Sequence, residues 1–313
     1  MGKSRCRGPG WGARNGRKGT YTAHLAQVFG TIVPVFAIIA VGWWLAARRT
    51  IDAASLADIA LLVTSPALVF SLLAASDLEP ERFATLAGGA AFVLAGTGAL
   101  ALLYVRGSGA PRRGVLLPSM LWNAGNMALP VCRLAFGPEG LEAAAVVFVL
   151  MVTVQSSFGI WLAKGEGGFR EALRLPLLQA SLLGLLFSAL GISLPRPILE
   201  PIEMLGAMAV PLMLLNLGIQ LRTLVIADVS HALAAVAIRI GGGFALGWLL
   251  TTLLGLEGVV RNVLMVQAIM PAAVINVVIA QRYDANPALV ASAIAIGTAL
   301  SALTIPALLW FLS

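Results

Sequence analysis

Ten apolar segments of similar length follow one another along the chain, separated by short polar turns. A helix needs about 20 mostly apolar residues to cross the hydrocarbon core of a bilayer, and each segment is close to that length. No turn between them is long enough to hold a soluble domain. The sequence therefore predicts an all-α membrane protein with ten transmembrane helices, over residues 25–47, 54–75, 83–105, 114–136, 141–163, 173–192, 198–221, 229–254, 258–281 and 287–312.

The composition agrees with this class. Only 11% of the residues are charged and the mean hydropathy is +0.92, whereas soluble domains carry roughly 25% charged residues. The net charge of +7 does not indicate nucleic-acid binding, because the basic residues mostly flank the apolar segments, where they orient helices. Cys6 and Cys132 form neither a disulfide framework nor a zinc motif, and two histidines are too few for a metal site. We expect no metal and no cofactor.

The fourth and ninth segments contain residues that interrupt a helix. Residues 123–130 read Asn-Ala-Gly-Asn-Met-Ala-Leu-Pro, and residues 270–276 read Met-Pro-Ala-Ala-Val-Ile-Asn. Pro130 and Pro271 each remove a backbone donor, and Gly125 weakens its turn. In hydrocarbon, the freed backbone groups must be buried in protein or line a wet cavity. We therefore expect two broken helices, hinged at Gly125, Pro130 and Pro271, whose breaks face each other.

The two halves of the chain repeat the same order of proline-bearing segments. Residues 65–72 of the second segment resemble residues 210–217 of the seventh, and the two breaks are likewise five segments apart. Five is odd, so the second copy enters the membrane from the opposite side, as in the inverted repeats of transporters. The predicted parts are a disordered basic tail or misassigned start, a first repeat, a cytoplasmic linker and a second repeat, over residues 1–24, 25–163, 164–172 and 173–313.

Basic residues in the turns predict the orientation. Turns after the odd-numbered segments carry ten basic residues, and the opposite side carries four. The positive-inside rule then places the 164–171 linker in the cytoplasm and the C-terminus outside. The six basic residues of the N-terminal tail oppose this assignment, and the internal turns are given more weight.

These motifs resemble the auxin efflux carrier family, the PIN-like transporters, in its short bacterial form. The resemblance covers residues 25–312 and rests on the two breaks, on Ser-Pro-Ala-Leu at 65–68, and on Pro-Leu at 211–212 with Leu-Gly at 217–218. It implies two crossing helices, a scaffold of helices one, two, six and seven, and a transport domain of the other six. It also implies a permease of the inner (plasma) membrane that moves a small malate-like or auxin-like carboxylate by alternating access. The sequence does not decide whether the protein forms a homodimer.

The breaks also predict where an anion binds. A helix that restarts at Pro130 or Pro271 presents unpaired N–H groups and the positive end of its dipole, which favour a carboxylate. We expect the substrate to contact residues of both breaks, and the alternative is that their amides only satisfy the interrupted backbone; the expected binding residues are Asn123, Asn126, Met127 and Asn276. Other amides are expected to hydrogen-bond between helices, namely Gln155, Asn216, Asn262 and Gln267.

Two charged residues within the apolar segments are candidate charge partners, Arg239 and Asp58. Charges in a membrane face a partner or a cavity, and for Arg239 pairing with a buried acid is favoured over neutralising an anion in transit. Neither break carries an acid that would bind sodium, so proton coupling, potential-driven transport or facilitation fits at least as well as a sodium-coupled symporter of the related bile-acid-transporter type. A signalling or structural membrane protein is a further alternative. The sequence contains no motif of an intramembrane enzyme.

Overall fold

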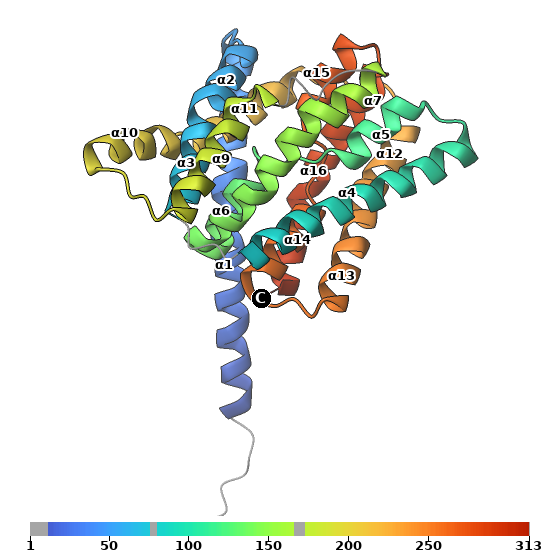
Figure 1. The fold of residues 1–313 in the computed structure, drawn as a ribbon. Helices are drawn as coiled ribbons and strands as arrows, with labels where there is room; N and C mark the ends of the chain where they lie inside the picture. The colour runs from blue at the N-terminus through green and yellow to red at the C-terminus, as the bar shows by residue number, and fades with distance from the viewer. Residues whose placement is uncertain (1–11, 76–79, 166–172, 313) are drawn as a thin grey trace, which may run out of the picture.

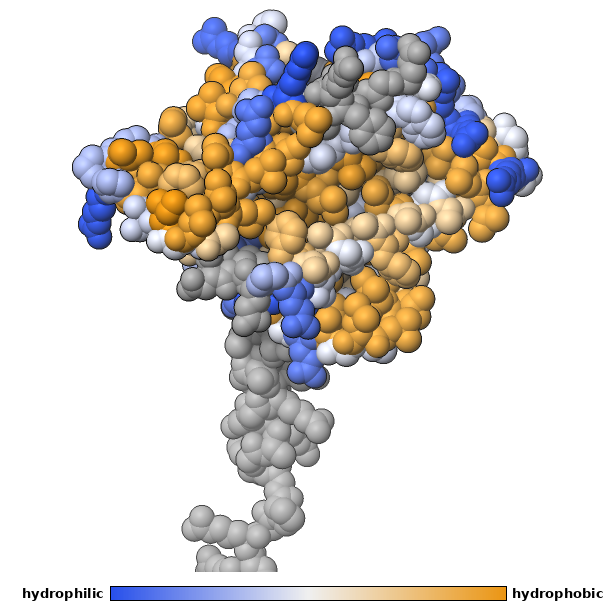
Figure 2. Space-filling view, in the orientation of Figure 1, coloured by the Kyte–Doolittle hydropathy of each residue, from blue (hydrophilic) through white to orange (hydrophobic). Residues whose placement is uncertain are grey.

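The computed structural model describes residues 12–75, 80–165 and 173–312, and these residues form a helical bundle (Figure 1). Seven stretches in it are long and apolar enough to cross a membrane: Gly30–Arg48, Ala53–Ala74, Pro80–Ser108, Ala128–Lys164, Arg196–Thr223, Ser230–Leu253 and Pro287–Leu312. Large apolar side chains such as Leu103, Leu253 and Leu303 are exposed. Figure 2 shows apolar residues over most of the visible face and polar ones along its upper edge. Such a surface suits lipid, so the chain is a multi-pass membrane protein.

The helices pack in two groups. In the first group, α1 lies along α11, and α3 packs against α9 and α10. Its elements are α1 (Gly12–Arg48), α2 (Ala53–Ile59), η1 (Ala60–Thr64), α3 (Ser65–Ala74), α9 (Pro176–Ala189), α10 (Arg196–Ala207) and α11 (Ala209–Thr223). Gly218 lets α1 and α11 approach closely, because a Cβ there would overlap the carbonyl oxygen of Ile39. Small residues at a contact are the usual way in which membrane helices pack tightly.

The second group holds the two interrupted helices. Its elements are α4 (Pro80–Ser108), α5 (Arg112–Met120), α6 (Ala128–Val154), η2 (Gln155–Gly159), α7 (Ile160–Lys164), α12 (Ser230–Val236), η3 (Ala237–Gly242), α13 (Gly243–Leu253), α14 (Gly258–Ala268), α15 (Ile275–Arg282) and α16 (Pro287–Leu312). The element α6 contains the end of the predicted fourth helix and the start of the fifth. A kink at Gly137, which has a φ of 69°, separates the two. Three π-helical turns, η1, η2 and η3, interrupt otherwise α-helical spans.

The predicted interruptions are confirmed, and the two breaks cross. Helix is absent between α5 and α6 and again between α14 and α15. The Asn123 N–H donates to the Pro271 carbonyl at 2.8 Å, and the Ala273 N–H donates to the Leu121 carbonyl at 3.0 Å. Trp122 and Ala272 thus form a short antiparallel bridge. Because each break satisfies backbone groups of the other, the interrupted segments need no water or lipid partner at this point.

The sequence predicted that the helices restart at Pro130 and Pro271. In the structure they restart at Ala128 and Ile275 instead. Pro130 lies in the first turn of α6, where the lost N–H would have no partner within the helix. Pro271 lies inside the second break and contributes its carbonyl to the crossing. Of the predicted tail, residues 1–11 lie outside the described residues, and from Gly12 the chain is part of α1. Residues 166–172 of the predicted linker also lie outside them.

Candidate functional site

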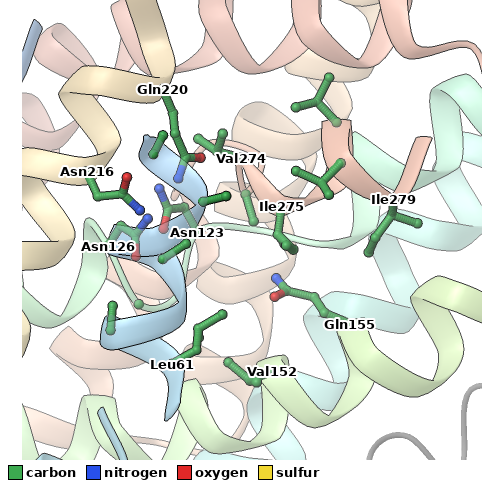
Figure 3. Close-up of a pocket in the computed structure, with 18 of the residues that line it drawn as sticks. Leu61, Asn123, Asn126, Val152, Gln155, Asn216, Gln220, Val274, Ile275 and Ile279 are labelled. Atoms are coloured by element: carbon green, nitrogen blue, oxygen red, sulfur yellow. The ribbon is translucent and has the colours of Figure 1, made fainter. Parts of the chain in front are cut away.

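A cavity of about 900 Å³ lies beside the crossing and takes its walls from both groups of helices. On one side are α2, η1 and α11 of the first group. On the other are the first break, η2 and α15 of the second group (Figure 3). Most of the wall is apolar, with Leu61, Val152, Ile275 and Ile279 among the lining residues. This size and character suit a small organic molecule with a few polar contacts.

The first break contributes two of the predicted binding residues, Asn123 and Asn126, together with the hinge residue Gly125. Asn123 is only 4% exposed, and its side-chain nitrogen Nδ2 is buried without a hydrogen-bond partner. Its backbone is fully used, because its N–H bonds to Pro271 and its carbonyl accepts from Ala128. A buried amide donor without a partner is costly, so Asn123 is suited to donate to a bound ligand.

Two further amides, Asn216 and Gln220, face the same space from α11 (Figure 3). Asn216 was expected only to hydrogen-bond between helices, yet its buried Oδ1 has no partner. Side-chain amides carry both donors and an acceptor, and the two ends are exchanged by a flip of the group. Their spacing of four residues is a signal in the sequence, since it places both side chains on one face of an apolar helix. The same spacing identifies Gln220, which is not among the residues predicted above.

Gln155 connects the cavity wall to the first break. Its Nε2 donates to the Trp122 carbonyl at 3.1 Å, and the residue also lines the cavity. Trp122 in turn donates from its indole nitrogen to Gln267 at 2.9 Å. Gln155 lies in the π-helical turn η2, and such turns are frequent at functional sites. The expected inter-helix hydrogen bonds of Gln155 and Gln267 are therefore present, and Gln155 also borders the site.

Asn276 and Met127, which were expected to contact substrate, do not line the cavity. Asn276 is fully buried, and its Nδ2 donates to the carbonyls of Leu117 and Leu121 at 3.3 and 2.8 Å. It therefore satisfies the end of α5, which is the alternative role considered for it. Met127 is also fully buried, and its sulfur accepts a hydrogen bond from Ser301 at 3.5 Å.

The two charged candidates also differ from expectation. Arg239 is 1% exposed and does not line the cavity. Its guanidinium donates to main-chain carbonyls and stacks on Trp122 rather than pairing with a buried acid. Asp58 lines the cavity, but it is an exposed residue of α2. Neither is a buried charge that faces the amides.

The second break adds a helix end to the cavity. Val274 and Ile275, at the start of α15, both line it. The N–H groups of Asn276 and Val277 donate to the carbonyls of Ala273 and Val274, and the helix dipole makes this end positive. Asn123 and Asn216 line the same cavity, and each has one side-chain polar atom without a hydrogen-bond partner. An environment with several neutral donors, a positive helix end and apolar walls can hold a carboxylate and bury its organic part.

Comparison with known proteins agrees with this description. Residues 167–309 match the model of a family described as membrane transport protein. An uncharacterized transporter of Methanocaldococcus jannaschii is 30% identical over 210 residues, which cover 64% of this chain and 68% of that protein. An uncharacterized transporter of Methanothermobacter thermautotrophicus is 28% identical over 90% of this chain and 96% of its own length. The auxin efflux carrier component 3a of Oryza sativa is 28% identical over 41% of this chain and 22% of its own length.

Proposed function

Because this chain belongs to the auxin efflux carrier family of membrane transport proteins, we propose that it carries a small organic anion across a membrane and binds it in the cavity beside the crossing. The observation that carries this proposal is one unsatisfied polar atom on each of two buried amides. Asn123 and Asn216 come from opposite groups of helices and line the same cavity, and the Asn123 Nδ2 and the Asn216 Oδ1 are both unsatisfied. A ligand that satisfies both would hold the two groups of helices together.

A carboxylate is the ligand that fits these groups best. It accepts from Asn123 Nδ2, and a flip of the Asn216 amide presents a second donor. Asn126 provides a further amide, and the positive end of the α15 dipole favours the negative charge. Hydrogen bonds to an ionised group are worth about 1.5–3 kcal/mol each. The site therefore needs no buried cation to select an anion.

The walls favour an auxin-like acid over a malate-like one. Leu61, Val152, Ile275 and Ile279 surround the amides with apolar surface. A monocarboxylate with an aromatic or aliphatic body buries apolar area there, at about 25 cal/mol per Å². A dicarboxylate would need a partner for its second charge away from these walls, such as Arg282, an exposed residue that also lines the cavity.

The position of the cavity between the two groups supports alternating access. We propose that the second group moves against the first, so that the cavity opens to each side in turn. The proposal includes ten spans in two inverted repeats: seven long stretches, the short apolar helix Pro176–Ala189, the interrupted α14–α15 helix, and an α5–α6 helix that ends at the kink in Ala128–Lys164. It also places the protein in the inner (plasma) membrane, with the central linker cytoplasmic and the C-terminus external.

Uptake into proteoliposomes tests the proposal. We expect labelled indole-3-acetate to accumulate faster than labelled malate with the wild type, and Asn123→Ala to raise its KM. Loss of one hydrogen bond to a charged group, about 1.5–3 kcal/mol, corresponds to roughly 10- to 150-fold. Asn262→Ala is the matched control, because Asn262 is another asparagine of an apolar helix and does not line the cavity. If wild type and Asn123→Ala showed equal uptake after subtraction of the uptake by empty liposomes, the assigned site would be contradicted.

A further inference from the structure

The most buried charge among the described residues lies behind the cavity wall. Arg239, in η3, donates from its two terminal nitrogens to both interrupted helices. Nη1 lies 3.3 Å from the Ser119 carbonyl and 3.4 Å from the Met120 carbonyl, at the end of α5. Nη2 lies 2.7 Å from the Ala268 carbonyl, at the end of α14. One guanidinium thus joins the C-terminal ends of the two broken helices.

These two ends form a natural site for a cation. The last carbonyls of a helix have no partner within it, and the dipole makes this end negative. Two such ends that meet inside a membrane create a cluster of carbonyl oxygens, which transporters with broken helices use to coordinate sodium or protons. In this chain the cluster is already bound by a permanently charged side chain.

The surroundings of Arg239 are shaped for the guanidinium. Its Cζ lies 4.7 Å from the centre of the Trp122 ring, a distance at which the ring face attracts a cation. Gly243, one turn further along the same span, leaves the necessary room, because a Cβ there would overlap the Ala268 carbonyl and approach Nη2 within 2.6 Å. Trp122 also lines the cavity, so it contacts both Arg239 and the space proposed for the ligand.

We propose that Arg239 is a built-in cation that takes the place of a coupling ion at the crossing, so that transport requires no sodium there. This inference rests on the proposed transport function and adds its energy coupling. A cation that is covalently attached to the protein cannot dissociate, so it holds the two helix ends together throughout the cycle without carrying energy from an ion gradient. Transport is then driven by the substrate gradient, the membrane potential or protons.

Thermal stability tests the inference without substrate. We expect the wild-type melting temperature to be the same in NaCl, KCl and N-methyl-glucamine chloride at equal ionic strength. Arg239→Ala should lower it by roughly 5–10 °C, as expected for loss of a buried charge network. Guanidinium at about 10 mM, far below denaturing concentrations, should restore part of the loss by filling the vacated position. Arg222→Ala is the control, because Arg222 also stacks on a tryptophan, Trp43 at 4.9 Å, but is exposed.

Guanidinium should leave the Arg222→Ala and wild-type temperatures unchanged. A saturable stabilisation of the wild type by sodium over potassium would overturn the inference, as would an Arg239→Ala protein that is as stable as wild type or is not rescued by guanidinium. If Arg239→Ala does not fold, Arg239→Lys provides the second variant. We expect it to fold, with a lower melting temperature, because an ammonium is a compact donor that cannot reach both helix ends as the planar guanidinium does. A melting temperature equal to wild type would count against the bridging role.

Uptake measurements under different cation gradients test the inference at the level of transport. We expect initial rates of wild-type uptake to agree within about twofold with an inward sodium gradient, an inward potassium gradient or no cation gradient. A sodium gradient that accelerates uptake more than tenfold would overturn the inference while leaving the proposed carrier function intact. Absence of uptake under every condition would instead contradict the proposed function, and the stability measurements on Arg239 would still decide whether it bridges the helix ends.

Discussion

Replacement of Asn276 by alanine should destabilise the protein without weakening substrate binding. Asn276 is fully buried and donates to the carbonyls of Leu117 and Leu121. Both carbonyls also accept a backbone N–H, from Leu121 and Ala273 respectively, so neither would be left without a donor. The loss is then two neutral hydrogen bonds at about 0.5–1.5 kcal/mol each, or about 1–3 kcal/mol. For a protein of this size we expect a fall in melting temperature of about 2–10 °C.

The chain contains its own reporter for this measurement. Cys132 is a free cysteine with no exposed surface, so in a Cys6→Ser background a thiol-reactive dye should label it only on unfolding. Asn123→Ala is the comparison, because the Asn123 side-chain nitrogen has no partner to lose. We expect Asn123→Ala to keep the wild-type melting temperature and to raise KM. We expect Asn276→Ala to lower the melting temperature and to keep the wild-type KM. An Asn276→Ala protein with unchanged stability, or with a KM raised as much as that of Asn123→Ala, would refute the distinction between the two amides.

Three further changes test the packing and the helix ends. Gly218→Ala should lower the free energy of unfolding by about 1–3 kcal/mol, because its Cβ would overlap the Ile39 carbonyl and push two packed helices apart; denaturation followed by dye labelling measures this. Gly125→Ala should slow uptake, because its Cβ would lie 2.5 Å from the Phe148 ring, which also lines the cavity; an unchanged initial rate would contradict this. Hydrogen bonds from a side-chain hydroxyl and from backbone N–H groups hold the pKa of Asp52 below its usual value. Its capping contribution is therefore present above the unfolded pKa of about 3.9 and lost as the pH falls below it, so the melting-temperature difference between wild type and Asp52→Ala should shrink towards pH 3.

The interruptions were predictable because their signal is local. Pro130, Gly125 and Pro271 lie within apolar segments too long to be turns, and only a broken helix accommodates such residues in hydrocarbon. The restart residues were not predictable in the same way. Proline is tolerated in the first turn of a helix, so Pro130 marks the neighbourhood of the break and Ala128 begins the helix.

The roles of the individual amides depend on contacts across the chain. Asn123 lies in the first break and borders the cavity, whereas Asn276 lies in the first turn of α15, just after the second break, and packs against the end of α5. No periodicity distinguishes these positions, because the crossing pairs residues about 150 apart in sequence. Asn216 and Gln220 carried a usable signal in their spacing of one helical turn. Gln155 and Arg239 lie in π-helical turns, whose extra residue changes the direction of a side chain in a way that a regular helical repeat does not predict.

The crossing has an electrostatic direction that supports the proposed class of ligand. At the end of α5, Asn276 binds the Leu117 carbonyl, and Arg239 binds those of Ser119 and Met120. The Ala268 carbonyl at the end of α14 is bound by the same guanidinium. The negative ends of both broken helices are therefore occupied by side-chain donors of the protein itself. The positive start of α15 borders the cavity, which supports the proposal that the substrate is an anion.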